Sequence, residues 1–109
     1  LQLMNDVQHY EAARAFAAEI IGAAPDKAGR IDFAYRRVLA RKAEAEELAL
    51  IGSFLDGQLA RYRAAPEEAK KAVSFGESKA PAELDPVELA SWALVGNLIL
   101  NLDEAVMRN

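Results

Sequence analysis

Arginine side chains near the middle of the chain could bind an anionic ligand or an acidic partner. Arg36, Arg37 and Arg41, together with Lys42, form the densest basic cluster in the sequence. A guanidinium group offers a planar fork of N–H donors that matches phosphate and carboxylate groups. The same arginines could instead pair with the acidic residues 44–47, which follow after a short connection. We favour this structural interpretation, because the predicted connection brings the two charge clusters close together.

Amide and phenol groups at two other positions could add to such a site. Asn97 lies in a largely apolar stretch, "SWALVGNLILNLDEAVMRN", where its amide could bond to a neighbouring backbone and fix the helix register. Alternatively, it could line a ligand pocket with Tyr35 and an arginine. The candidate interaction or ligand contacts are therefore Tyr35, Arg36, Arg37, Arg41 and Asn97.

Residues for catalysis or for holding a cofactor are sparse. The chain has no cysteine and a single histidine, His9, whereas a metal site normally needs three or four ligands. The carboxylates of residues 44–47 are expected in the solvated first turn of a helix, where little would shift their pKa values. No serine has the sequence context of a nucleophile elbow. The sequence thus predicts a non-enzymatic segment without a bound metal or cofactor of its own.

The composition favours one all-α domain spanning residues 1–109. Alanine, leucine, glutamate, lysine and arginine are frequent, and the chain has only 6 glycines and 4 prolines. The formal net charge of −4 argues against nucleic acid as a partner. No apolar run is long enough to predict a membrane span. Residues 1–5 read as the tail of an upstream element, so we expect a fragment of a larger protein.

Apolar residues recur at three- and four-residue steps and predict the helices. We expect helices over residues 7–21, from Asp26 to about Arg41, 43–64, 66–73 and 85–101. A final turn, 104–108, would follow with Asp103 as its cap. The predicted fold is a single helical bundle of four main helices plus one short helix.

Local signals refine these boundaries. The sequence "DPVE" makes Asp85 an N-cap, Pro86 the first helical residue and Glu88 the partner in a capping box. The helix that follows is apolar over so much of its surface that we expect it in the middle of the bundle. Gly52 and Gly57 weaken the third helix, which is tolerable where another helix packs closely.

Three stretches, in order, resemble signatures of one bacterial family. The stretch "LMNDVQHYEAARAFAAEII" resembles its "LLND-x-x-x-x-E-x-A-R-x-x-A" segment. The stretch "RIDFAYRRVLARKAEAEELALIGSFL" resembles its arginine-rich helix and the acidic start of the next helix. The stretch "ELASWALVGNLILNLDEAVMRN" resembles its closing "W-x-x-V-x-x-x-L-x-N-x-x-E-F" pattern. The chain thus resembles the C-terminal planctomycete-specific domain, of unknown function, of large proteins with a planctomycete-type cytochrome c domain.

This resemblance implies the C-terminal part of a much larger exported or periplasmic protein, in which any haem would be bound upstream. The family has proline and a hydroxyl cap in the turn before the third helix, whereas this chain has "ARKAEAEE" there. The aromatic residue after the family's closing glutamate is replaced by Ala105. No catalytic residue carries over, since the family's activity is not established. The positions that match are Asn5, Asp6, Glu11, Ala13, Arg14, Trp92, Asn101 and Glu104.

Three hypotheses of function follow, of which the least favoured is an enzyme domain with Glu11, Arg14 and Glu104 as candidate residues. In the first, the chain is a non-catalytic structural or interaction module that packs against upstream domains of its own chain or against a protein partner. This hypothesis predicts an exposed apolar patch around Leu1, Leu3 and Met4. In the alternative, the chain is a helical domain that binds a small ligand or peptide in a pocket with a few converging polar groups.

Overall fold

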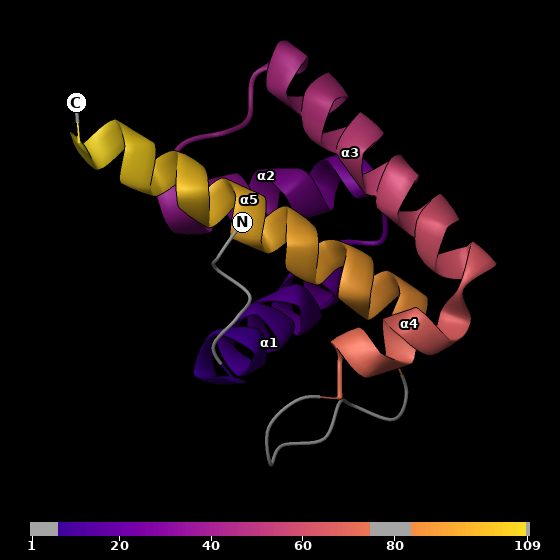
Figure 1. The fold of residues 1–109 in the computed structure, drawn as a ribbon. Helices are drawn as coiled ribbons and strands as arrows, with labels where there is room; N and C mark the ends of the chain where they lie inside the picture. Colours follow the sequence, from indigo (N-terminus) through magenta and orange to yellow (C-terminus); the bar gives the residue numbers. More distant parts are fainter. Residues whose placement is uncertain (1–6, 75–83, 109) are drawn as a thin grey trace.

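A computed structural model of the chain describes the backbone of residues 7–74 and 84–108 and the side chains of residues 12–74 and 84–102. The described part is helical and contains no strand. Its helices are α1 (Val7–Ala23), α2 (Lys27–Leu39), α3 (Ala45–Ala64), the short α4 (Pro66–Ala72) and α5 (Pro86–Arg108) (Figure 1). The predicted all-α bundle of four main helices plus one short helix is therefore confirmed.

Helix α5 crosses the middle of the molecule and contacts each of the other four helices (Figure 1). Its side chains Leu89, Trp92, Val95 and Ile99 are almost fully buried. A helix with apolar side chains around most of its circumference needs cover on several sides. The prediction that this segment forms the centre of the bundle is confirmed, and the other helices are arranged around it.

Helix α1 packs tightly on α5 because Gly96 leaves room for the ring of Phe16. A Cβ atom at residue 96 would lie 2.9 Å from that ring, well inside van der Waals contact. Arg14 adds a second contact between helices, since the residue is only 7% exposed and its guanidinium donates to the backbone carbonyl of Val73, just after α4. A buried charged group of this kind has to be hydrogen-bonded, and here the bond fixes α1 against the end of α4.

Polar caps begin two of the helices as predicted. The Asp26 carboxylate accepts from the N–H of Gly29 at 3.0 Å and caps α2. The Asp85 carboxylate accepts from the N–H of Val87 at 3.1 Å at the start of α5. These bonds satisfy N–H groups that have no partner inside the helix. Pro66 is the first residue of α4, where its missing N–H costs nothing.

The turn between α2 and α3 depends on an alanine in a left-handed conformation. Helix α2 ends at Leu39, two residues before the predicted end, and Ala40 has φ 58°. The N–H of Ala40 donates to the carbonyl of Arg36 at 3.1 Å. Glu44 then takes the N-cap position of α3, and its N–H donates to the carboxylate of Glu47 at 2.8 Å. The reciprocal bonds of Glu44 and Glu47 thus cap the start of α3.

The predicted end of the last helix at residue 101 is wrong, because α5 runs without a break to Arg108. A separate final turn capped by Asp103 therefore does not form. Asparagine and aspartate inside a helix cost less than about 1 kcal/mol each, and tertiary packing overrides so small a penalty. The predicted end of α1 at residue 21 is also wrong, because the helix continues through Gly22 to Ala23.

Glu88 has a different role from the one predicted by the capping box. Its carboxylate lies 3.4 Å from Nη1 of Arg30 in α2 and 3.9 Å from Nη2 of Arg63 in α3. The Arg30 guanidinium also lies over the indole of Trp92, 5.7 Å from the ring centroid. Two cations near a half-buried carboxylate attract it more strongly than one backbone N–H. Glu88 thus joins α2, α3 and α5 at this end of the bundle.

Some predictions fall outside the described residues. These are the exposed apolar patch around Leu1, Leu3 and Met4 and the roles of the side chains of His9, Glu11 and Glu104. For the described part, none of the helices combines the length and apolar character needed to cross a bilayer.

The left-handed Ala40 predicts that one substitution has opposite effects at two exposed alanines. Ala40→Gly should raise the free energy of unfolding by about 1 kcal/mol, because glycine adopts positive φ without the steric cost of a Cβ atom. The matched change Ala60→Gly, within α3, should lower it by about 1 kcal/mol. Urea denaturation of the three proteins measures both effects. Equal effects at the two positions would contradict the conformation of Ala40.

Candidate functional site

Tyr35, Arg41 and Glu47 form a polar cluster where α2 turns into α3. The guanidinium of Arg41 donates to both carboxylate oxygens of Glu47, at 2.7 and 2.8 Å. It also lies over the ring of Tyr35, 5.3 Å from the centroid. The Tyr35 side chain is 1% exposed and hydrogen-bonds to Glu47. The predicted pairing of the basic cluster with the acidic residues is thus confirmed for Arg41.

The electrostatics of this cluster hold each group in one protonation state. The hydrogen bonds from Arg41, followed by the backbone N–H of Glu44, lower the pKa of Glu47 from 4.5 to about 2. Burial raises the pKa of Tyr35, and the neighbouring Glu47 carboxylate raises it further. The same carboxylate raises the pKa of Arg41. At neutral pH, Glu47 is therefore a firmly ionised acceptor, which suits a structural clamp better than proton transfer.

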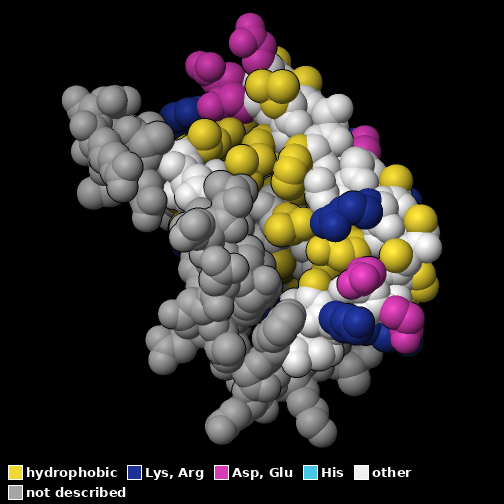
Figure 2. All heavy atoms as spheres, viewed as in Figure 1, with side chains coloured by type: hydrophobic (Ala, Val, Ile, Leu, Met, Phe, Trp, Pro, Cys, Tyr) yellow, Lys and Arg dark blue, Asp and Glu magenta, His cyan; other side chains and the backbone are white. Residues whose placement is uncertain are grey.

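An apolar groove lies directly beside this cluster. The α3–α5 groove has a volume of about 400 Å³. It is lined by Tyr35, Glu47, Leu50, Ile51, Leu98 and Leu102. Leu50 stands on its edge and is 71% exposed. Figure 2 shows hydrophobic side chains gathered between α3 and α5, next to the acidic side chains at the start of α3.

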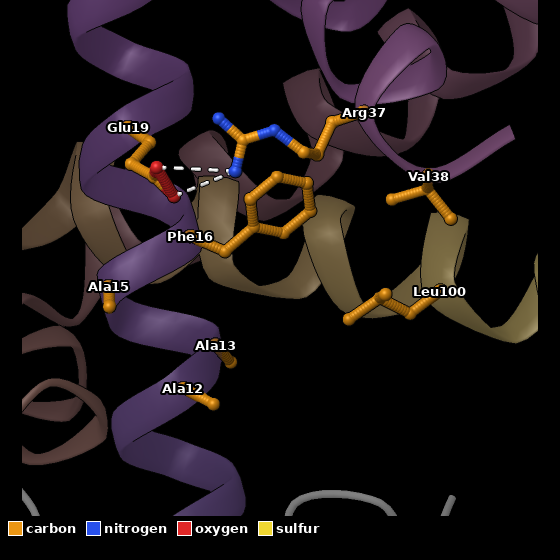
Figure 3. Close-up of a pocket in the computed structure, with 8 residues that line it drawn as sticks. All are labelled: Ala12, Ala13, Ala15, Phe16, Glu19, Arg37, Val38 and Leu100. Carbon is orange, nitrogen blue, oxygen red and sulfur yellow. Dashed lines mark hydrogen bonds and ion pairs between the residues drawn. The ribbon is translucent and has the colours of Figure 1, made fainter. Parts of the chain in front are cut away.

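A second groove, the α1–α5 groove, lies among α1, the end of α2 and α5 and has a volume of about 580 Å³. Its lining residues are Ala12, Ala13, Ala15, Phe16, Glu19, Arg37, Val38 and Leu100 (Figure 3). Nη1 of Arg37 lies 3.3 Å from both oxygens of Glu19, so an ion pair bridges α2 and α1 beside the Phe16 ring (Figure 3). Apart from this pair, the groove is apolar, and Leu100 is 38% exposed.

The structure distributes the five predicted contact residues over different places. Tyr35 and Arg41 meet in the cluster beside the α3–α5 groove, whereas Arg37 lies in the α1–α5 groove. Arg36 is exposed near the end of α2, and Asn97 is 3% exposed within α5. Tyr35 and Asn97 line no common groove among those described. A role for any of the five in binding a ligand or partner stays a prediction.

Sequence reasoning missed the residue that most distinguishes this surface. Leu50 falls outside the apolar stripe of α3. The buried members of that stripe are Ile51, Leu55 and Tyr62. A large apolar residue off the buried stripe of an amphipathic helix is a signal that could have been found in the sequence. The leucines of α5 that accompany it, Leu98 and Leu102, could not be assigned to the same groove before the packing of α3 and α5 was known.

No three side chains of histidine, aspartate or glutamate in the described part of the chain come close enough together to hold an ion. The acidic groups that do lie near other charges are used in ion pairs, as Glu19 and Glu47 are.

A scan against protein-family models, a search of curated proteins and a search of solved structures each found no match to this chain. The resemblance to the planctomycete-specific domain therefore continues to rest on the three quoted stretches.

The lowered pKa of Glu47 predicts an acid-sensitive contribution to stability. Because the folded-state pKa lies below the ordinary value, the contribution is complete above about pH 4.5 and is lost as the pH falls toward 2. Glu47→Gln should lower the free energy of unfolding at neutral pH and make its decrease over this window shallower. Urea denaturation at several pH values measures this. Glu46→Gln is the matched control and should leave the slope unchanged; equal slopes for all three proteins would exclude the clamp.

Proposed function

We propose that this chain is a non-catalytic helical interaction module that docks protein surfaces around Leu50 of α3. The observation that carries the proposal is the 71% exposure of Leu50 at the edge of an apolar groove. A single exposed leucine needs no explanation, but a leucine continuous with other apolar side chains does. Leu98 and Leu102 of α5 provide that continuity.

The energetics of this surface support docking. Burying a leucine fully contributes roughly 1.5–3 kcal/mol, and Leu50 has most of its surface still to bury. The walls of the groove are held by the Arg41–Glu47 pair, so little ordering is needed on binding. A central apolar anchor with a charged edge is the usual composition of a protein interface.

The polar groups near the groove support a role other than catalysis. The most perturbed carboxylate, Glu47, is committed to Arg41 and Tyr35 and stays ionised far below neutral pH. A general acid or base needs a pKa near the working pH. The cluster is accordingly assigned to positioning the groove.

The family resemblance supplies the context of the proposal. It would make the chain the C-terminal part of a large exported cytochrome c-type protein, with upstream domains as the nearest partners. Intact mass and the visible absorption spectrum of the native protein test this context. A mass far above 11.9 kDa with a haem Soret band would support it. A native mass near 11.9 kDa without haem would remove it and favour a separate protein as the partner.

Docking around Leu50 predicts protection of this residue in the native assembly. Carbene footprinting should label Leu50 and Leu98 several-fold less in the native protein or complex than in the isolated chain. Leu50→Gln should weaken docking by about tenfold or more with little effect on folding, because Leu50 contributes little to the core. Ala45→Gln changes an exposed residue in the first turn of the same helix that lines neither groove and is the control. Equal labelling of the two preparations would contradict the proposal.

The α1–α5 groove favours the alternative, a small-ligand site, because its volume lies in the usual range for ligand pockets. Its apolar lining and the Arg37–Glu19 pair suit an apolar molecule with a polar end. Ala15→Phe should fill the groove and abolish saturable binding of the apolar anion anilinonaphthalene sulfonate, as measured by fluorescence titration. Ala64→Phe, on α3, is the control. Weak binding that does not saturate and is unchanged by Ala15→Phe would exclude this alternative.

A further inference from the structure

The outer face of α3 carries a regular pattern that nothing within the described chain covers. Its members recur at alternate steps of four and three residues, and all of them are exposed. They are Glu46, Leu50, Ser53, Gly57, Ala60 and Ala64. This is the spacing of a seam between two helices, and it runs along the side of α3 opposite to the buried Ile51 and Leu55. Figure 1 shows α3 at the edge of the molecule.

Gly57 is hard to explain within a single copy of the chain. Glycine weakens the middle of a helix relative to alanine, and a Cβ atom at residue 57 would meet none of the described residues within 4 Å. Gly52, in the same helix, differs, because a Cβ atom there would lie 3.4 Å from the side chain of Lys27. A neighbouring side chain therefore contacts the position of Gly52, whereas no described residue does so at Gly57.

The charges of α3 identify the partner that fits this face. The helix begins with Glu46 and Glu47 and ends with Arg61 and Arg63. Glu46 and Arg61 make no ion pair with any other described residue; Arg61 hydrogen-bonds to Gln58 and lies over Tyr62. A second copy of α3 running in the opposite direction would bring each acidic end against a basic end. A parallel copy would bring like charges together.

We infer that the partner docked at Leu50 is a second copy of this chain, with the two α3 helices antiparallel about a two-fold axis that passes between Ser53 and Gly57 of each copy. This inference rests on the proposed function and specifies its partner. A two-fold axis makes the same surface face itself, and the seam spacing then fixes the pairs. Leu50 packs on Ala60 of the second copy, and Gly57 packs on Ser53, so each larger residue meets a smaller one.

The charge contacts between the two copies decide how strong the pair is. Glu46 of each copy lies within reach of Arg61 of the other, which gives two attractive contacts. Asp56 of the two copies lies on the same side of the axis, but each is already paired with its own Lys27 at 3.1 Å. One helix pair of 20 residues, about 30 Å long, forms a small interface, so we expect a dissociation constant in the micromolar range.

Sedimentation velocity over low to high micromolar concentrations tests the inference. The wild type should pass from the 11.9 kDa monomer to the dimer. Glu46→Arg and Arg61→Glu should each raise the dissociation constant by about tenfold, since two contacts change from attraction to repulsion. The double variant Glu46→Arg, Arg61→Glu should regain the wild-type value. Glu68→Arg, the same charge change on α4, is the control, and circular dichroism checks that all variants fold.

Each outcome separates this inference from the proposed function. A wild type that stays monomeric, or a dimer insensitive to both charge reversals, overturns the antiparallel pair. The protection of Leu50 in the native protein is measured independently, so protection without self-association would leave the interaction module and replace its partner by another segment or protein. Two results together support both the antiparallel pair and the interaction module. Leu50→Gln should weaken self-association, and the double variant Glu46→Arg, Arg61→Glu should restore it.

Discussion

The burial of α5 is the constraint on which the rest of the structure depends. Trp92, Val95 and Ile99 lie deep inside the bundle, and side chains on the other faces of α5 are also apolar. No single neighbour can cover such a helix, so four helices pack around it. The contact with α1 is close only because Gly96 makes room for Phe16. The order of the helices around the bundle follows from which of their faces can cover which part of α5.

The same constraint explains why the grooves lie where they do. Leu98 and Leu100 are two residues apart and therefore point about 200° apart around the helix. Leu98, with Leu102, lines the α3–α5 groove, and Leu100 lines the α1–α5 groove on the other side. The four covering helices thus leave both flanks of this part of α5 incompletely covered. Both candidate sites are gaps in the cover of the central helix.

The sequence determines more of the fold than of the candidate site. Asp26, Asp85 and Pro66 act locally, on N–H groups within the next turn, so their roles could be predicted. Glu88 could not be assigned, because its partners come from α2 and α3 and are far away in sequence. The partners of the basic cluster after α2 could not be assigned either, because they come from different helices. Arg41 pairs with Glu47 of α3, whereas Arg37 pairs with Glu19 of α1.

Helix α3 combines two faces with different requirements. Its inner face is explained by the fold, down to Gly52, over which the Lys27 side chain lies on its way to Asp56. Its outer face keeps Leu50 and Gly57 exposed, where a lone soluble helix would favour polar, helix-forming residues. The clamp of Arg41 and Glu47 orders the start of this helix without using its outer face. An exposed outer face, on a helix held by its inner face, is the arrangement on which the proposed interface depends.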